Sequence, residues 1–482
     1  MDSFAARIDP DRLVIRYLDG TTTASPLTAA LVAERRAGLR VMDRESIRTG
    51  ALLAALSTAL DLTEGQLPGH ALRTCHLAMR LADHLSLSSE DKANLFIASF
   101  LKDAGCSSNA AAVTRIFGTD DIALKTRQST TERSMLAYAA LTMRSLPSTE
   151  PLPQRIRRLI SIGLNGRRES REAEQLRCER GAAIARKAGF ESSVSDAILD
   201  LHEHWDGGGL PRGLRGADIH RLARILAACQ GLDVFVSVQG RARGLAVLAA
   251  RRGSWYDPDV TDALLEACTR GLLDELTAPD LIGRTMDLEP AGLISTSDDD
   301  DIDRIAGAFA DIVDAKSPFT GSHSRRAAEV AEGLAVRLGL PVAAVTDVRR
   351  AALLHDLGKL GVPNVILDKP GRLDAGEMEV IRRHPELTLR ILAPIPTFAS
   401  VAALAACHHE RLDGRGYFRG LAAPELAIGA RIIAVADVYE ALTADRPYRT
   451  AMPRAEALRT MAGMAGEHLA ADVVAALDAT VT

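Results

Sequence analysis

Two stretches of the sequence, HEHWDGGGLPRGLRG (202–216) and HERLDGRGYFRGLAA (409–423), share one pattern of histidine, glutamate, aspartate and glycine. A second matching pair precedes them in the same order, IASFLKDAG (97–105) and RAALLHDLG (350–358). Matching blocks in one order predict a tandem duplication of a single domain.

The spacing between these blocks is repeated as well. The histidines of LPGHALR (67–73) and FTGSHSRR (319–326) each stand 32 residues before the next block, in the pairs His70–Lys102 and His323–His355. An arginine then follows the aspartate of each glycine-rich block by 18 residues, in the pairs Asp206–Arg224 and Asp413–Arg431. Equal offsets support a duplication rather than a chance similarity.

Composition and periodicity favour helices. The chain has 482 residues, of which 47% are hydrophobic, and this excludes global disorder. Aromatic residues make up only 4%, and alanine, leucine and arginine are frequent, which favours helices over sandwiches or barrels. Apolar residues recur at helical spacing in 51–62 and 70–85. We predict an all-α protein made of two tandem helical domains.

Domain boundaries follow from changes in residue composition and helical periodicity along the chain. We expect an N-terminal extension over 1–48, a first domain over 49–275 and a second domain over 302–482. Proline, glycine, serine and the acidic run from Asp298 to Asp301 predict a short linker over 276–301. Asp298 or Ser297 could also cap the helix that follows.

Charge and cysteine content limit the class of protein. The net charge of −5 argues against binding a nucleic-acid polymer through bulk charge. Six scattered cysteines without a C-x-x-C pair are typical of reduced thiols. No secretory signal is visible, and no apolar run approaches the roughly 18 residues of a membrane span. We expect a cytoplasmic protein without a membrane segment, and homodimerisation is left open.

The second domain concentrates residues that bind metals. Imidazoles supply neutral nitrogen ligands, and a carboxylate can bridge two cations. Neighbouring helix residues are about 100° apart, so an adjacent His-Asp pair can reach one site at a helix edge. Seven candidate ligands are too many for one structural zinc and indicate a two-metal site: His323, His355, Asp356, His384, His408, His409 and Asp437.

On these motifs the second domain resembles an HD-GYP domain, a branch of the HD phosphohydrolase superfamily. The matching motifs are FTGSHSRR (319–326), AALLHDLGKLGVP (351–363), LDKPGRL (367–373), HPEL (384–387), HHERLDGRGY (408–417) and ARIIAVADVYEALTADRPYR (430–449). The resemblance implies a helical HD-type fold, two or three metal ions, with iron or manganese expected, and hydrolysis of cyclic di-GMP or a related cyclic dinucleotide.

The resemblance also implies a role for each residue. One metal corresponds to His323, His355, Asp356 and Asp437, and the second to His384, His408 and His409, with Asp356 bridging. Asp356 and Lys359 are the implied catalytic residues, and Lys359 is expected beside the scissile phosphate. Substrate contacts are implied for Lys359, Tyr417, Arg446 and Arg449, although a structural role for the two arginines is left open.

Two of the departures from the family pattern bear on the site. The third residue of the Gly-Tyr-Pro motif is Phe418, and because proline fixes φ, its loss is expected to loosen this loop. Phe319 stands where some relatives carry a glutamate that serves a third metal, so two divalent metals are expected here.

The first domain has lost most of these residues and is predicted to be degenerate. Lys102, Arg177, Leu201 and Gln230 stand at the positions of His355, His384, His408 and Asp437. A lysine ammonium repels a cation and offers no lone pair. We therefore expect no hydrolysis in this domain, which serves either as a scaffold or as a sensor or dimerisation module.

The predicted function is a metal-dependent phosphodiesterase that hydrolyses cyclic di-GMP. Two alternatives stay open: a phosphohydrolase acting on another nucleotide, and a regulatory or adaptor protein with poor turnover. The complete ligand set argues against the adaptor, whereas Phe418 keeps it open. No kinase, cyclase or receiver signature identifies an input signal.

Overall fold

The computed structural model describes residues 14–16, 22–24, 47–130, 145, 151–293, 296–318, 321–445 and 449–481. The chain divides into two compact units, residues 1–46 and 47–482. In the first unit β1 (Val14–Arg16) pairs antiparallel with β2 (Thr22–Ala24). The second unit contains both repeated domains, called here the N-terminal copy and the C-terminal copy.

The N-terminal copy is built from helices. Its elements are β3 (Ile47–Arg48), α2 (Thr49–Glu64), α3 (His70–His84), α4 (Ser89–Leu101), α5 (Ala110–Phe117), α6 (Asp121–Ser129), α8 (Leu152–Lys187), α9 (Ser192–Leu199), η1 (Gly216–Asp218), α10 (Arg221–Gln239), α11 (Arg241–Ala250), α12 (Pro258–Thr269) and α13 (Leu272–Glu275).

The C-terminal copy follows a short connecting segment. That segment holds α14 (Leu281–Met286), η2 (Ala291–Leu293) and β4 (Thr296–Ser297). The copy itself comprises α15 (Asp299–Asp314), α16 (His323–Arg337), α17 (Val342–Leu354), η3 (Leu357–Gly361), α18 (Asn364–Leu367), α19 (Ala375–Arg382), α20 (His384–Leu392), η4 (Pro396–Phe398), α21 (Ala399–Ala406), η5 (Ala423–Glu425), α22 (Ile428–Thr443), α23 (Arg454–Ala462) and α24 (Ala471–Leu477). The all-α prediction is confirmed.

Among the described helices, α10 is long and apolar enough to cross a membrane by length and composition alone, and half of its apolar window is buried inside the fold. Leu222, Ile225 and Leu226 on this helix are fully buried, and the helix packs against α3 and α11. The core helix of a globular domain has the same composition.

The acidic run at 298–301 lies at the start of a helix, and Asp298 is its N-cap. Asp298 accepts a 2.7 Å hydrogen bond from the backbone of Asp301 and caps α15, whose first turn holds the other three aspartates. Carboxylates are favoured at a helix N-terminus because of the capping bond and the helix dipole. The first helix of the C-terminal copy therefore begins at Asp299.

The remainder of the predicted linker packs on the N-terminal copy. Thr285 on α14 is buried and lies 3.1 Å from Nδ1 of His76. Glu289 accepts a 3.1 Å hydrogen bond from the backbone of Gly50, and β4 pairs antiparallel with β3. Proline, glycine and serine mark the turns of this segment, but its folding onto α2 and α3 depends on partners more than 200 residues earlier.

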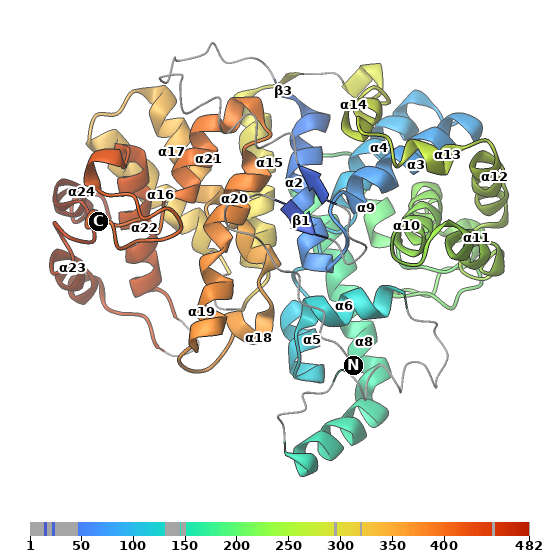
Figure 1. Cartoon of the computed structure of the whole chain (residues 1–482), viewed down its shortest axis with the longest axis horizontal. Helices are drawn as coiled ribbons and strands as arrows, with labels where there is room; N and C mark the ends of the chain where they lie inside the picture. The colour runs from blue at the N-terminus through green and yellow to red at the C-terminus, as the bar shows by residue number, and fades with distance from the viewer. Residues whose placement is uncertain are drawn as a thin grey trace. The chain divides into compact units, whose positions relative to one another are not determined.

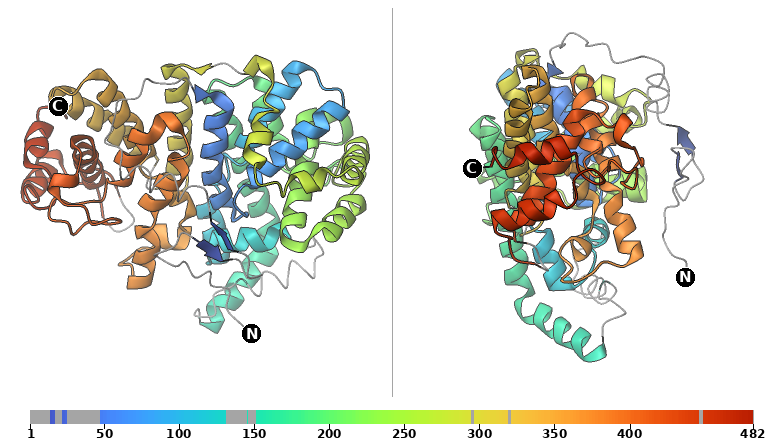
Figure 2. Two further views of the ribbon diagram at one scale, coloured as in Figure 1. Left: turned by 45° about the horizontal axis from the view of Figure 1, so that its top comes forward. Right: turned by 90° about the vertical axis from the view of Figure 1, so that its left-hand side faces the viewer.

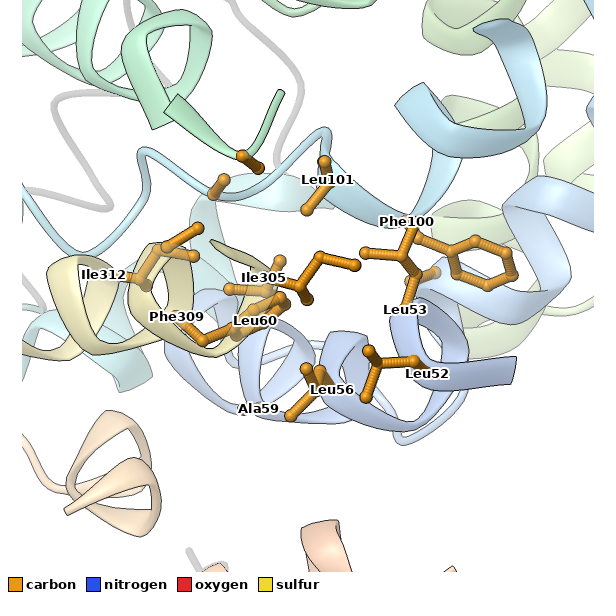
Figure 3. Packing of buried hydrophobic residues seen from close by; sticks show 14 of the residues in the cluster. Leu52, Leu53, Leu56, Ala59, Leu60, Phe100, Leu101, Ile305, Phe309 and Ile312 are labelled. Carbon is orange, nitrogen blue, oxygen red and sulfur yellow. The ribbon is translucent and has the colours of Figure 1, made fainter. Parts of the chain in front are cut away.

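The two copies share one hydrophobic core. Leu56 and Leu60 of α2 and Ile305 and Phe309 of α15 are almost fully buried and lie in one cluster. Figure 3 shows Leu60 beside Ile305 and Phe309 between the two helices, with Leu56 on another side of α2. Each fully buried leucine contributes roughly 2 kcal/mol. Figures 1 and 2 show the N-terminal copy in blue to green and the C-terminal copy in yellow to red, meeting along α2 and α15.

Contacts across this interface are reciprocal. Helix α2 packs against η3 and α20 of the C-terminal copy, and α15 packs against α8 of the N-terminal copy. Thr63 donates a 3.2 Å hydrogen bond to the carbonyl of Leu360, and Ser107 donates a 2.6 Å bond to the carbonyl of Ile312. Each copy thus contacts the other close to the His-Asp motif or its counterpart.

Candidate metal centre

All seven predicted ligands meet in one cluster of the C-terminal copy, and most of them stand at helix ends. His323 and His384 begin α16 and α20, whereas His355 directly follows α17 and His408 stands two residues after the end of α21. Asp437 alone projects from within a helix, α22. The cluster is buried, with His409 the most exposed side chain at 26%.

Three of the histidines are oriented in the same way. Nδ1 of His355, His384 and His408 donates to the carbonyl three residues earlier, at 2.7, 2.7 and 2.6 Å. The last carbonyls of a helix lack intrahelical partners, so a histidine just past the helix end can satisfy one of them. With the proton on Nδ1, each ring directs the lone pair of Nε2 into the cluster, as a metal ligand requires.

One group of ligands surrounds Oδ2 of Asp356. Nε2 of His323 and Nε2 of His355 lie 3.5 and 3.4 Å from this oxygen, and 3.3 Å from each other. Oδ1 of Asp437 is 3.3 Å from Nε2 of His323. One ligand atom each from His323, His355 and Asp437 lies close enough together to hold one ion.

A second group surrounds the other oxygen of Asp356. Nε2 of His384 is 3.3 Å from Oδ1, and Nε2 of His408 is 3.7 Å from it. His409 completes this group with His384 and His408. Oδ1 of Asp356 is buried and accepts no hydrogen bond within the described part of the chain.

The donor set of the cluster fits bound cations. Nε2 of His384 and Nε2 of His408 are only 3.0 Å apart, although both rings already use the Nδ1 proton elsewhere. Two facing lone pairs repel each other unless a cation lies between them. Together with the orphan oxygen of Asp356, this indicates space for one cation on each side of that carboxylate.

A further acidic residue orients His323. Nδ1 of His323 donates to Glu440 on α22, and Arg326 donates to the same carboxylate at 2.5 and 3.0 Å. A carboxylate behind a ligating histidine fixes the ring and raises its basicity. Sequence reasoning missed this role, although Glu440 stands one helical turn after Asp437 and on the same helix face.

The protonation states suit metal ligands. Burial lowers the pKa of His355 and His408, and it lowers the pKa of His409 to about 3. Burial raises the pKa of Asp356, but His355 and Lys359 outweigh that effect and hold it well below its usual value. At neutral pH the rings of His355, His408 and His409 are therefore neutral and the carboxylate of Asp356 is ionised.

His323 differs from the other ligands. Burial disfavours its charged form, but hydrogen bonds to Asp356, Asp437 and Glu440 raise its pKa well above the usual value. Three carboxylates thus surround one imidazole. A cation placed there would take over the positive charge that a proton on His323 otherwise supplies.

Two predicted substrate residues lie beside the cluster. Nζ of Lys359 is 2.5 Å from Oδ2 of Asp356. The ring of Tyr417 lies 4.8 Å from the ring of His409, and the guanidinium of Arg382 lies 5.5 Å above Tyr417. Arg382 was not predicted; its position two residues before His384 is the only signal that the sequence holds.

Of the two arginines predicted to contact the substrate, Arg449 lies within the described residues. Arg449 donates to the carbonyls of Ala441 and Leu442 at 2.6 and 2.8 Å, and to that of Thr450 at 3.1 Å. Its guanidinium therefore satisfies the C-terminal end of α22, which favours the structural alternative over a substrate contact. Arg446 and Phe319 lie outside the described residues.

The loop around Phe418 is held by Glu410. This buried carboxylate accepts hydrogen bonds from the backbone of Arg419 at 2.7 Å and of Leu421 at 3.0 Å. A side chain at Gly416 would approach the backbone of Glu410 and Arg411 to 2.6 Å or less. The equivalent Glu203 accepts three backbone N–H groups in the N-terminal copy, where Pro211 stands at the position of Phe418, so the same glutamate anchors the loop with either residue.

The N-terminal copy replaces ligands with cations at the equivalent site. Lys102 pairs with Asp103, and Nη2 of Arg177 lies 3.3 Å from both Asp103 and Glu64. A Cβ at Gly105 would collide with the carbonyl of Arg177, just as one at Gly358 would collide with the carbonyl of His384. Arg177 is therefore the structural counterpart of His384.

This second site is unsuited to a metal. Glu64, Asp103 and Cys106 lie close enough to share an ion, but both carboxylates already pair with lysine or arginine. Burial keeps the pKa of Cys106 well above its usual value, so the thiol stays protonated. The remaining cavity, of about 250 Å³, is lined by carboxylates and cations together, among them Glu64, Asp103, Lys125 and Arg177.

Known proteins share this arrangement of domains. The HD domain family matches residues 121–260 and 307–473 of the chain. A curated relative from Vibrio cholerae, "3'3'-cGAMP-specific phosphodiesterase 3", is 41% identical over 85% of this chain and 89% of its own length. A "cyclic di-GMP phosphodiesterase" of Pseudomonas aeruginosa is 43% identical, but over 30% of this chain and 35% of its own.

A solved structure covers most of both chains. The crystal structure of a cyclic GMP-AMP-specific phosphodiesterase of V. cholerae, V-cGAP3, aligns with a TM-score of 0.62 and 36% identity. The alignment covers 91% of this chain and 98% of that one. The similarity therefore extends over both copies.

Proposed function

We propose, from the premise that the chain belongs to the HD-GYP phosphodiesterases of the HD superfamily, that its C-terminal copy hydrolyses a 3′,3′-cyclic dinucleotide at a two-metal centre. The N-terminal copy carries no hydrolytic site in this proposal, because cations occupy its ligand positions.

The position of Asp356 is the observation that carries the proposal. Its two oxygens face two separate groups of histidines, Oδ2 towards His323 and His355 and Oδ1 towards His384 and His408. A carboxylate placed in this way can bridge two cations. The ligand assignment proposed is His323, His355, Asp356 and Asp437 for one ion, and Asp356, His384, His408 and His409 for the other.

Two divalent cations bound there would activate water and offset negative charge on the reacting phosphate. The chain itself supplies the surroundings. Lys359 adds a positive charge next to Asp356, where a phosphate oxygen can accept a hydrogen bond. Tyr417 and Arg382 form one wall beside His409, suited to the ring and phosphate of a nucleotide. Attack of water on phosphorus breaks one ester bond and opens the cyclic substrate.

The substrate proposed first is 3′,3′-cGAMP. The relative named for this substrate matches the chain over both copies, whereas the cyclic di-GMP phosphodiesterase of P. aeruginosa matches about a third of it. Cyclic di-GMP, the substrate predicted from the sequence motifs, is the second candidate. The two differ by one purine base and share the phosphodiester that the site would hydrolyse.

The test is hydrolysis of 3′,3′-cGAMP, cyclic di-GMP and cyclic di-AMP by protein loaded anaerobically with Fe²⁺ or Mn²⁺. Asp356→Asn is expected to lose metal and turnover, and Asp103→Asn, at the equivalent position of the N-terminal copy, is the matched control. Product formation that depends on metal and on Asp356 supports the proposal. Absence of turnover on all three substrates with two ions bound per chain would refute it.

A further inference from the structure

The segment that follows Asp356 is anchored by the N-terminal copy. The carbonyl of Leu360 on η3 accepts a 3.2 Å hydrogen bond from Oγ1 of Thr63, at the end of α2. It also accepts a 2.9 Å hydrogen bond from Nζ of Lys316, which is 1% exposed. One buried donor from each copy thus fixes a single carbonyl.

Two more contacts hold the same segment. Oδ1 of Asp121 accepts a 2.8 Å hydrogen bond from the backbone of Asn364, and both residues are fully buried. Leu62 packs against Gly361, where a Cβ would lie 3.5 Å from the leucine side chain. The N-terminal copy therefore contacts residues 360–364 at three points.

Lys359 lies between this anchor and the metal centre. Its backbone N–H donates to the carbonyl of Asp356 at 2.8 Å, and its carbonyl accepts from the backbone of Val362 at 3.0 Å. Because η3 is one tight turn, a shift of the Leu360 carbonyl moves the backbone of Lys359 with it. The ammonium of Lys359 is the group that approaches Asp356.

The end of α2 that carries Thr63 is itself fixed by the former metal site. Glu64 lies 3.3 Å from both Lys125 and Arg177, and Nζ of Lys125 lies 3.4 Å from the carbonyl of Thr63. These ion pairs hold the last turn of α2 in the orientation that directs Thr63 towards Leu360.

We propose that the N-terminal copy contributes a positioning residue to the catalytic centre of the C-terminal copy: Thr63 fixes the Leu360 carbonyl and thereby places Lys359 beside the substrate phosphate. This inference rests on the proposed function. It gives the degenerate copy a mechanical role that requires neither metal nor ligand, since its own cations and carboxylates maintain the contact.

The test compares Thr63→Val, which keeps the shape but removes the donor, with Thr63→Ser, which keeps the donor. Thr63→Val is expected to lower kcat about 5- to 10-fold with KM within about twofold, because small misplacements of a catalytic group are costly. Thr63→Ser is expected to stay within about twofold of the parent. Metal content and circular dichroism verify that each variant is folded and loaded.

A double-mutant cycle with Lys359→Met separates positioning from general loosening. If Thr63 acts through Lys359, adding Thr63→Val to Lys359→Met produces no further loss of kcat. Two results would overturn the inference. In one, the double variant loses kcat by the product of the two single-variant factors; in the other, Thr63→Val is as active as the parent.

Binding of a hydrolysis-resistant phosphorothioate analogue of 3′,3′-cGAMP is measured for the same variants, and Thr63→Val is expected to bind it within about twofold of the parent, in line with its KM. An active parent with multiplicative losses refutes the positioning role and leaves the proposed function intact. A parent that neither hydrolyses the cyclic dinucleotides nor binds the analogue refutes both.

Discussion

Asp103 and Asp356 occupy equivalent positions in the two copies. Replacing Asp103 by asparagine should lower stability, whereas replacing Asp356 should remove bound metal and activity. Three cations of the N-terminal site, Lys102, Lys125 and Arg177, lie against three carboxylates, Glu64, Asp103 and Glu174. Asp103→Asn leaves this cluster with one uncompensated positive charge, and Lys102 is 3% exposed. Removing one partner of a buried ion pair costs about 3–5 kcal/mol.

The expected result for Asp103→Asn is a free energy of unfolding lower by about 3–5 kcal/mol, with metal content unchanged and kcat per folded molecule within about threefold. Asp356→Asn should instead remove the ligand shared by the two metals, so that bound metal is lost and kcat falls by more than about 10³-fold. Urea unfolding, elemental analysis and turnover of the two variants provide the comparison.

Two results would contradict this reasoning. An Asp103→Asn variant whose unfolding free energy changes by less than about 1 kcal/mol would show that its cations do not depend on that carboxylate. Loss of a metal ion from the same variant would show that the N-terminal copy binds metal after all.

Three further outcomes are expected. Glu440→Gln should weaken metal binding about 10- to 100-fold, because the carboxylate orients His323; calorimetric titration of the metal-free protein measures this, and unchanged affinity would contradict it. Burial raises the pKa of Asp61 to about 6 from 3.8, so between these values the folded state binds more protons and its stability falls as pH rises. The stability of the parent relative to Asp61→Asn should therefore increase by up to about 3 kcal/mol from pH 7 to pH 4, whereas a difference that is constant with pH would refute the shift. Chelation should speed hydrogen exchange in α16, α17 and α22 but not in α3 and α4, since the N-terminal site neutralises its own charges; equal effects in both copies would contradict this.

Sequence alone was informative wherever the signal is local or periodic. Repeated blocks at equal offsets predicted the duplication, and helical periodicity predicted the fold class. The seven candidate ligands were recognised because histidines and aspartates in fixed motifs are rare by chance. The same alignment identified Lys102 as a cation at a ligand position, and the structure places it against Asp103.

Other features depend on partners that are distant in the chain. The sequence left open whether Arg449 contacts substrate or is structural, and in the structure its donors satisfy carbonyls at the end of α22. The segment 276–301 has the composition of a linker, yet it packs on α2 and α3. Local composition reports which conformations a segment tolerates, and it does not report which surface the segment will cover.

The sequence by itself determined that this protein is a tandem helical repeat in which one copy retains a complete set of candidate metal ligands. Only the tertiary structure decided that the two oxygens of Asp356 face separate histidine groups, that Glu440 supports His323, and that Thr63 of one copy anchors the Leu360 carbonyl of the other. The physical reason is that these relations are distances between residues far apart in the chain, which only the packing of the helices brings together. Spacing along one helix cannot encode such distances.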